Sequence, residues 1–228
     1  MIISINQPAY LPWLGYFNRI IKSDLHVVLD TVQFEKNSFI NRNRIIINHK
    51  PVWLTVPVLT KNLFGKLAIN TVEIDNKMAW NKKHFLSLRQ AYSKNRFFCD
   101  MEEFLENLYA NEQDKLIYIL MRNINFFIEY LSIKTPIVYA SDYYFKECKS
   151  DLVLEICEKF GAKKYISGAL GRNYLDISKF HAHGITVEYD DYIHPFYDQG
   201  HKEFTPYLSA IDLLVRFGKK SRMIIENV

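Results

Sequence analysis

Glycine, cysteine and long apolar runs are scarce in this chain, and each scarcity narrows what the protein can be. The 228 residues include 8 glycines, and no stretch has the spacing of a P-loop or of a dinucleotide-binding loop. Three cysteines, Cys99, Cys148 and Cys157, form neither an even disulfide set nor a metal-ligand spacing, which favours a reducing compartment. No run approaches the roughly eighteen apolar residues of a membrane span, and the N-terminal segment turns polar too early for a signal peptide. We therefore expect a cytoplasmic protein without a membrane span.

An excess of charge of one sign is lacking as well. The 29 basic and 25 acidic residues give a net charge of +4 and are spread along the chain, so nucleic acid is not an expected partner. Aromatic residues are abundant instead, with 15 Tyr and 16 Phe, which suggests amphipathic surfaces in addition to a core.

Hydrophobic periodicity predicts an alternating α/β pattern at both ends of the chain. The first unit is a strand at 2–5, a helix at 13–22 and a strand at 25–30. The second has strands at 137–141, 163–167 and 185–192 and a helix at 151–161. Strand, helix and strand in succession imply parallel pairing with a right-handed crossover.

The middle of the chain has a different pattern. The pattern predicts a β-hairpin over residues 43–58, turning at 48–51, and a further strand at 71–75. It predicts a run of helices over residues 80–131 and another helix from about Tyr207. We predict a single α/β domain over residues 1–228, with a Rossmann-like, mostly parallel sheet flanked by helices. An antiparallel β-hairpin extension at about 43–75 and a helical insertion or cap at about 80–131 are added to it.

Polar residues follow every predicted strand, where ligands bind in open α/β sheets. The polar residues found in this way are Asn6, Gln7, Asp30, Gln33, Ser141, Asp142, Ser167, Gly168, Asp190, Asp191 and His194, and the site candidates among them are Gln7, Asp30, Gln33, Ser167, Gly168 and His194. Gln7 and Asp30 could bind a ligand hydroxyl, or they could only satisfy the polar backbone of their loops.

A basic cluster at 36–44 is the most phosphate-like feature of the sequence. It contains Lys36, Asn41, Arg42, Asn43 and Arg44. Guanidinium and ammonium groups suit anionic oxygens, and the amides add neutral donors. The alternative interpretation is a solvated basic loop without a ligand.

His194 is a candidate general base, because its ordinary pKa lies near neutrality. No carboxylate or cysteine stands at a familiar ligand spacing from it, so a metal site is not predicted. Cys157 lies on the apolar face of its helix, and Ser167 lacks the Gly-x-Ser-x-Gly context of a nucleophile elbow. Covalent catalysis by cysteine or serine is therefore not expected.

Several segments resemble the WbqC-like family along almost the whole chain. They are INQPAYLPWLGYFNRIIKSDLHVVLDTVQFEKNSFINRNRI, VWLTVPV, YISGALGRNYLD, GITVEYDDYIHPFYDQ and FTPYLSAIDLL. The resemblance implies a bacterial cytoplasmic protein associated with O-antigen (lipopolysaccharide) and other surface-polysaccharide loci, but no defined reaction. It also directs attention to Tyr10, Tyr174, Tyr197 and Gln199.

We hypothesise an enzyme that transfers an acyl or aminoacyl group to the amine of a nucleotide-linked amino sugar. The expected catalytic residues are His194, Asp30 and Tyr10. The expected substrate-binding residues are Gln7, Gln33, Lys36, Asn41, Arg42, Asn43, Arg44, Ser167, Gly168, Tyr174, Tyr197 and Gln199.

This hypothesis leaves the donor open. A coenzyme A or carrier-protein thioester is one candidate, so an acyl carrier protein is a candidate partner, as is a second copy of the chain. One alternative is an ATP-dependent or nucleotidyl-transferring enzyme, although the histidines of the class I nucleotidyltransferase signature are missing where Tyr10 and Gly15 stand. The other alternative is a non-catalytic module that binds a glycan precursor or a partner enzyme.

Overall fold

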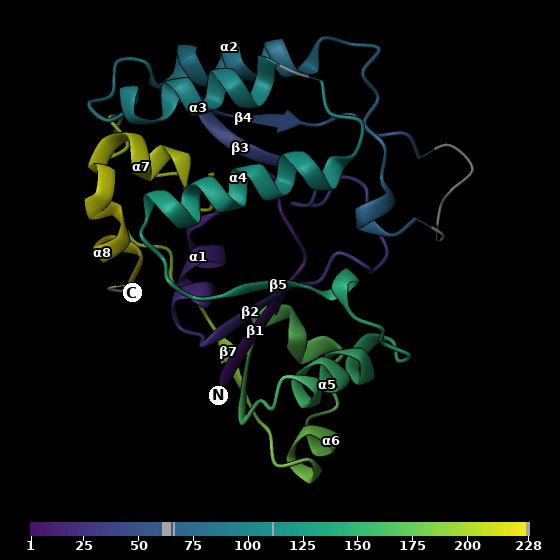
Figure 1. Cartoon of the computed structure of the whole chain (residues 1–228). Coiled ribbons are helices and arrows are strands. Elements are labelled where there is room, and N and C mark those ends of the chain that lie inside the picture. Colours follow the sequence, from purple (N-terminus) through teal and green to yellow (C-terminus); the bar gives the residue numbers. More distant parts are fainter. Residues whose placement is uncertain (61–64, 66, 111, 227–228) are drawn as a thin grey trace.

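The computed structural model describes residues 1–60, 65, 67–110 and 112–226. A 5-stranded parallel sheet lies in one half of the molecule (Figure 1). Its strands are β1 (Ile2–Asn6), β2 (Leu25–Val28), β5 (Ile137–Tyr139), β6 (Lys164–Gly168) and β7 (Thr186–Asp190). Their spatial order is β5-β2-β1-β6-β7, and every neighbouring pair is parallel. The predicted Rossmann-like parallel sheet is confirmed.

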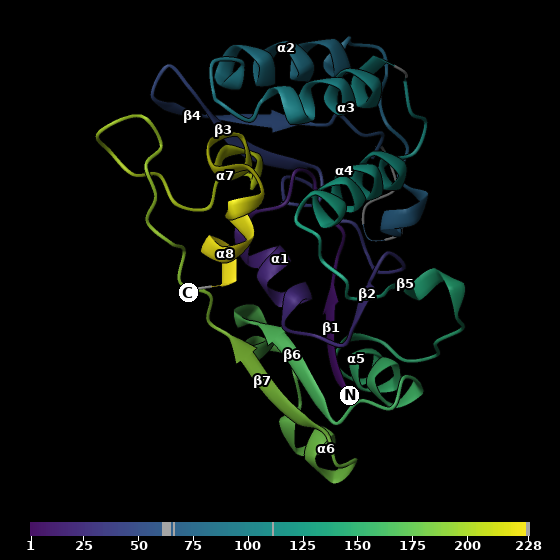
Figure 2. The ribbon, with the colours of Figure 1, turned by 60° about the vertical axis from the view of Figure 1, so that its left-hand side comes forward.

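Helices cover both faces of this sheet (Figures 1 and 2). On one face lie α1 (Leu14–Ile21) and α4 (Leu116–Tyr130), whose Phe17 and Phe127 rings meet with centroids 5.6 Å apart. On the other face lie α5 (Lys149–Lys159) and α6 (Ile177–Ala182), which bury Ile3 and Ile5 of β1 in a second core. Because the order of strands reverses at β1, a topological switch point lies between β1 and β6.

The chain between β2 and β5 forms a second layer. The antiparallel strands β3 (Arg42–Ile47) and β4 (Lys50–Thr55) form their own 2-stranded sheet, as the hairpin prediction required. Above them lie α2 (Trp80–Tyr92) and α3 (Cys99–Ala110) (Figure 1). With α4, these helices account for the helices predicted at 80–131.

Two local predictions were wrong. Residues 71–75 form no strand but follow the 3-10 turn η1 (Ile69–Thr71) and make only isolated bridges, Val58 to Ile74 and Glu73 to Lys115. The alternation of this segment reflects the burial of Val72 and Ile74 rather than a ladder of hydrogen bonds. The helix expected from Tyr207 begins at Ile211 instead, because Tyr207 has a φ of 59° and cannot belong to a right-handed helix.

The last helices, α7 (Ile211–Phe217) and α8 (Ser221–Glu226), lie beside α1 (Figure 2). Short 3-10 turns follow the ends of β5, β6 and α7, namely η2 (Ala140–Asp142), η3 (Ala169–Asn173) and η4 (Gly218–Lys220). None of the helices that the structure describes is long and apolar enough to cross a membrane.

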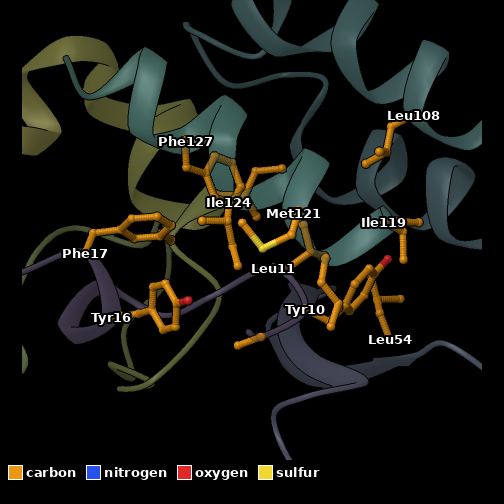
Figure 3. Close-up of a cluster of buried hydrophobic side chains, with 14 of the residues drawn as sticks. Tyr10, Leu11, Tyr16, Phe17, Leu54, Leu108, Ile119, Met121, Ile124 and Phe127 are labelled. Carbon is orange, nitrogen blue, oxygen red and sulfur yellow. The ribbon is translucent and has the colours of Figure 1, made fainter. Parts of the chain in front are cut away.

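The corner between β1 and α1 joins the two layers. Tyr10 and Leu11 point toward Leu54 of β4 and toward Ile119 and Met121 of α4 (Figure 3). The backbone of the corner is held by long-range hydrogen bonds, because the Tyr10 N–H donates to the Phe39 carbonyl at 3.1 Å and the Asn43 amide donates to the Leu11 carbonyl at 2.6 Å. This anchoring fixes the position of everything that follows the end of β1.

Candidate functional site

An open crevice of about 290 Å³ lies beyond the carboxyl end of β1, at the switch point of the sheet. Its walls come from the β1–α1 corner, α1, the loop before β3 and the turn after β6. The lining residues are Asn6, Gln7, Pro8, Ala9, Trp13, Tyr16, Arg19, Glu35, Ser38, Phe39, Ile40 and Leu170. We name this space the switch-point crevice.

A larger hollow, of about 470 Å³, lies along α5 and is lined by Tyr144, Phe145, Glu155, Glu158 and Lys159. Tyr144 is 79% exposed there. This hollow is a surface groove on the outside of a covering helix, whereas the switch-point crevice receives polar groups from the ends of the strands. We therefore place the candidate site in the smaller space.

Arg19 is the charged side chain at the base of the crevice. It is 9% exposed, although it belongs to a helix that also buries Leu14, Phe17 and Ile20. Its Nη1 donates a hydrogen bond to the Oδ1 atom of Asn6, at the end of β1. The guanidinium also lies against Gly168, at the end of β6.

Asp190, at the end of β7, supplies the negative charge nearest to Arg19. Its Oδ2 lies 3.7 Å from the Nε of Arg19, and its Oδ1 accepts a hydrogen bond from the Nζ of Lys22 at 2.8 Å. Asp190 is 6% exposed, and the Asn18 amide approaches it at 3.4 Å. Three adjacent strands therefore contribute Asn6, Gly168 and Asp190 to one polar cluster around Arg19.

Trp13 forms an aromatic wall of the crevice. The absence of a side chain at Gly15 makes room for it, since a Cβ there would overlap the Trp13 ring and lie 2.9 Å from Tyr192. The Trp13 ring packs edge-on against Tyr192 and Tyr207, each with a centroid separation of 5.6 Å.

His194 lies behind this wall, one ring away from the crevice. Its ring centroid is 6.4 Å from that of Tyr192 and 5.5 Å from that of Tyr207. The Nδ1 atom lies 3.1 Å from the Pro195 carbonyl, and the buried Nε2 has no partner among the described residues. Burial lowers the pKa of His194. With its proton on Nδ1, the ring is neutral and offers Nε2 as a proton acceptor.

Other predicted residues lie at or near the crevice. Gln7 lines it, and Gly168 contacts Arg19. Ser167 is buried beneath η3, where its hydroxyl donates to the Gly168 carbonyl at 3.1 Å. Tyr174 is 49% exposed. Burial raises its pKa, and the nearby charge of Arg19 has a smaller, opposite effect.

Tyr10 and Asp30 make their polar contacts elsewhere. The Tyr10 hydroxyl is fully buried between His84 and Tyr109 of the helical layer. Both carboxylate oxygens of Asp30 accept hydrogen bonds from Ser141, from its N–H at 3.0 Å and from its hydroxyl at 2.6 Å. These contacts connect separate parts of the chain and do not line the crevice.

Two of the predicted amides likewise serve the backbone. The Gln33 side chain donates to the Phe34 carbonyl and accepts from the Leu67 N–H. Gln199 is 2% exposed and closes its loop by exchanging two hydrogen bonds with the Thr205 backbone. Tyr197 is also buried and donates to the carboxylate of Asp212 at 3.0 Å.

The basic cluster divides into two groups. Asn41 and Asn43 are buried and donate to the carbonyls of Val56 and Leu11. The side chains of Arg42 and Arg44 instead lie over the Trp53 ring, with the guanidinium carbons 4.3 and 5.4 Å from its centroid, while Lys36 is exposed.

This arginine and tryptophan face adjoins the crevice. The ring of Phe39, which lines the crevice, is 6.0 Å from that of Trp53 by centroid. The Arg44 guanidinium donates to the Pro206 carbonyl at 3.3 Å, next to Tyr207. We name the exposed face formed by Arg42, Arg44 and Trp53 the hairpin shelf.

Arg19, Trp13 and Tyr16 were missed as site residues by sequence reasoning, whereas Asp190 was noted as a polar strand end without a role. A charge on an amphipathic helix ordinarily faces solvent, so the helical pattern gives no reason to place Arg19 in a buried site. The available signal was that it is the only charged residue in the helix LGYFNRII, which directly follows the first buried strand.

The fold and the crevice define a Rossmann-like α/β protein with an open, partly apolar crevice at its switch point. Within the described ranges, no group of His, Cys, Asp and Glu side chains is placed to hold a metal ion. The chain belongs to the WbqC-like protein family, whose family model matches residues 7–224. The predicted resemblance is thus confirmed.

One relative has similar length and no assigned role. Uncharacterized protein Rv1507c of Mycobacterium tuberculosis (strain ATCC 25618 / H37Rv) is 32% identical to this chain over 221 residues. The matched region covers 96% of this chain and 95% of that protein. No solved structure shows significant similarity to the chain.

Proposed function

We propose that this protein is a cytoplasmic transferase of bacterial surface-glycan biosynthesis. It adds an acyl or aminoacyl group to the amine of a nucleotide-linked amino sugar. The switch-point crevice is the observation that supports this proposal most strongly, because it combines amides, aromatic walls and a buried cation in one open space. Pockets with apolar walls and a few placed polar groups are typical of small-molecule sites.

The acceptor in this proposal lies in the crevice. The amide of Gln7 suits sugar hydroxyls, because an amide both donates and accepts hydrogen bonds. The rings of Trp13 and Phe39 offer apolar faces to the sugar ring. The donor lies on the neighbouring hairpin shelf, whose two guanidinium groups suit the phosphates of a coenzyme A or phosphopantetheine thioester.

The reaction requires little covalent help from the protein. The sugar amine attacks the acyl carbonyl, the new C–N bond forms, the C–S bond of the donor breaks, and the amine proton ends on the departing thiolate. Positioning the two substrates side by side supplies most of the acceleration. The base in this scheme is His194, and its Nε2 reaches the amine only when the rings of Tyr207 and Trp13, which separate it from the crevice, move aside.

The test is to incubate the purified protein with a panel of nucleotide-linked amino sugars and acyl thioesters and to analyse the products by mass spectrometry. The expected product is a nucleotide sugar heavier by one acyl group. We expect His194→Ala to lower kcat by about a hundredfold or more, the range for loss of a general base. The matched control is His201→Ala, at a histidine of the same loop that packs edge-on against His49, and this variant should keep its activity.

Three other results would replace the proposal. Product formation that requires ATP and magnesium would favour the ATP-dependent alternative. Binding of nucleotide sugar without product, unchanged in His194→Ala, would favour a non-catalytic binding module. If no nucleotide sugar is bound or converted, the proposed substrate class is wrong.

A further inference from the structure

We infer that Arg19 is the anion-binding centre of the switch-point crevice and that it holds the diphosphate of the nucleotide-linked substrate. This inference rests on the proposed function only in naming the nucleotide as the source of the diphosphate. It assigns the acceptor's phosphates to a residue of α1, separate from Arg42 and Arg44 of the hairpin shelf.

The first argument is the unused hydrogen-bonding capacity of Arg19. A guanidinium carries five N–H donors and keeps its charge. Within the described residues, Arg19 donates one hydrogen bond, from Nη1 to Asn6, and its buried Nε has no partner at hydrogen-bond distance. An arginine that is 9% exposed and makes so few bonds is costly to the folded protein. The Nε faces Asp190, so the donors left for a ligand with several acceptor oxygens are those on the Nη atoms.

The second argument is that two of the residues lining the same crevice carry further unpaired donors. The Nδ2 atom of Asn6 and the hydroxyl of Tyr16 are buried and have no hydrogen-bond partner in the described part of the chain. Buried polar atoms are nearly always paired, so each exception calls for an explanation. The N–H groups of an amide and of a guanidinium can only donate hydrogen bonds, and the phenol hydroxyl can donate one as well. These groups therefore suit a ligand whose polar atoms are all acceptors. A diphosphate is such a ligand.

The third argument concerns charge. Asp190 is the counter-ion of Arg19. The distance from the Arg19 Nε to the Asp190 Oδ2 is 3.7 Å, which is longer than the 2.8 Å from the Lys22 Nζ to the Asp190 Oδ1. Lys22 is exposed and does not line the crevice, but it shares the carboxylate of Asp190, so the charge of buried Arg19 is only partly balanced. Glu35 also lines the crevice, but it is exposed and comes from the loop before β3, so water screens it. The buried end of the crevice therefore favours an anion.

The fourth argument is the room left by Gly168. A Cβ at this position would lie 3.0 Å from both Nη atoms of Arg19. The missing side chain leaves room for the guanidinium of Arg19, a residue that lines the crevice, against the end of β6. Arginine forks bind phosphate oxygens through two parallel hydrogen bonds, so the orientation of this edge matters as well as its charge.

The test is isothermal titration calorimetry, which measures the Kd of the whole chain for UDP, pyrophosphate, inorganic phosphate and uridine. We expect UDP and pyrophosphate to bind, inorganic phosphate to bind at least tenfold more weakly, and uridine more weakly still. Arg19→Lys and Arg19→Gln should raise the Kd for pyrophosphate about tenfold to a hundredfold, as expected for lost charge-assisted hydrogen bonds. Arg172→Gln removes an exposed guanidinium that pairs with Asp191, and it should leave the Kd unchanged.

Gly168→Ala keeps the test decisive if the Arg19 variants do not fold. It retains the charge of Arg19 but displaces the guanidinium, so it should also raise the Kd for pyrophosphate several-fold. The inference is overturned if pyrophosphate fails to bind, if uridine or inorganic phosphate binds as tightly, or if folded Arg19 and Gly168 variants bind pyrophosphate like the wild type.

The outcomes also separate this inference from the proposed function. Arg19-dependent binding of pyrophosphate without any acyl transfer would sustain the anion site and reject the transferase. Acyl transfer with an unchanged KM for the nucleotide sugar in Arg19→Lys would reject the anion site and sustain the transferase.

Discussion

Replacing Tyr10 by phenylalanine tests whether this residue of the corner is structural or catalytic. The Tyr10 hydroxyl lies 2.8 Å from the Nδ1 of His84 and is hydrogen-bonded to the hydroxyl of Tyr109. All three side chains are at most 4% exposed. We assign the ring proton of His84 to Nε2, beside the Thr55 backbone, so that Nδ1 accepts from Tyr10 and Tyr10 accepts from Tyr109.

The expected loss of stability follows from this geometry. Tyr10→Phe leaves a buried acceptor on His84 and a buried donor on Tyr109, each without its partner. One such unsatisfied group costs about 1–3 kcal/mol, so the pair should cost roughly 2–6 kcal/mol. For a chain of this size, 1 kcal/mol lowers Tm by about 2–4 °C, which gives a fall of roughly 4–24 °C. Tyr109→Phe should cost less, because the bond from Tyr10 to His84 survives.

Thermal unfolding followed by circular dichroism measures these effects. The control is Tyr118→Phe, because Tyr118 is 54% exposed on α4 and should melt like the wild type. The double variant Tyr10→Phe with Tyr109→Phe should lose less than the sum of the single losses, since the two share one hydrogen bond. A Tm for Tyr10→Phe equal to that of the Tyr118 control would refute the reasoning. If activity falls while Tm does not, the catalytic assignment of Tyr10 is the better one.

Three further predictions concern other parts of the fold. Asp30→Asn should lower Tm by several degrees, because the bonds from Ser141 lose a charged acceptor at a cost of about 1–3 kcal/mol; an unchanged Tm with lost activity would point to a ligand role. Gly15→Ala should displace the ring of Trp13, cost about 1–3 kcal/mol and shift the tryptophan fluorescence; an unaltered spectrum and Tm would contradict this. Burial lowers the pKa of His84 from 6.5 to about 4, so the unfolded chain binds its proton first as pH falls. The contribution of neutral His84 to the free energy of unfolding should therefore be fully present above pH 6.5 and should decline toward pH 4 by up to about 1.4 kcal/mol per pH unit. The variant His84→Gln should reduce this slope.

The boundaries of most elements could be predicted because their signals are local. The apolar run at 2–5 and the alternation around 42–55 correspond to β1 and to the β3–β4 hairpin. The strand prediction at 71–75 was wrong for the same reason, because alternating apolar residues indicate burial and not the presence of a neighbouring strand. The predicted helix start at Tyr207 was wrong because the positive φ of this residue depends on the contacts of its loop with Trp13 and Arg44, which are distant in sequence.

The candidate site was harder to predict than the fold. Gln7 and Gly168 were found because the carboxyl ends of parallel strands share one edge of a sheet. Tyr10 and Asp30 are equally polar in the sequence, but their hydrogen bonds go to Tyr109 and Ser141, about a hundred residues away. Whether a polar group is free to bind a ligand depends on partners that the local sequence does not reveal.

The sequence by itself determined the family, the parallel α/β character and the inserted hairpin and helices, because each is encoded in motifs or in hydrophobic periodicity. Only the tertiary structure decided that β6 lies next to β1, and with it the position of the crevice. That adjacency turns Arg19 from an ordinary helix charge into a buried cation between Asn6, Gly168 and Asp190. The physical reason is that burial and unpaired hydrogen-bond donors arise from long-range packing, which periodicity along the chain does not specify.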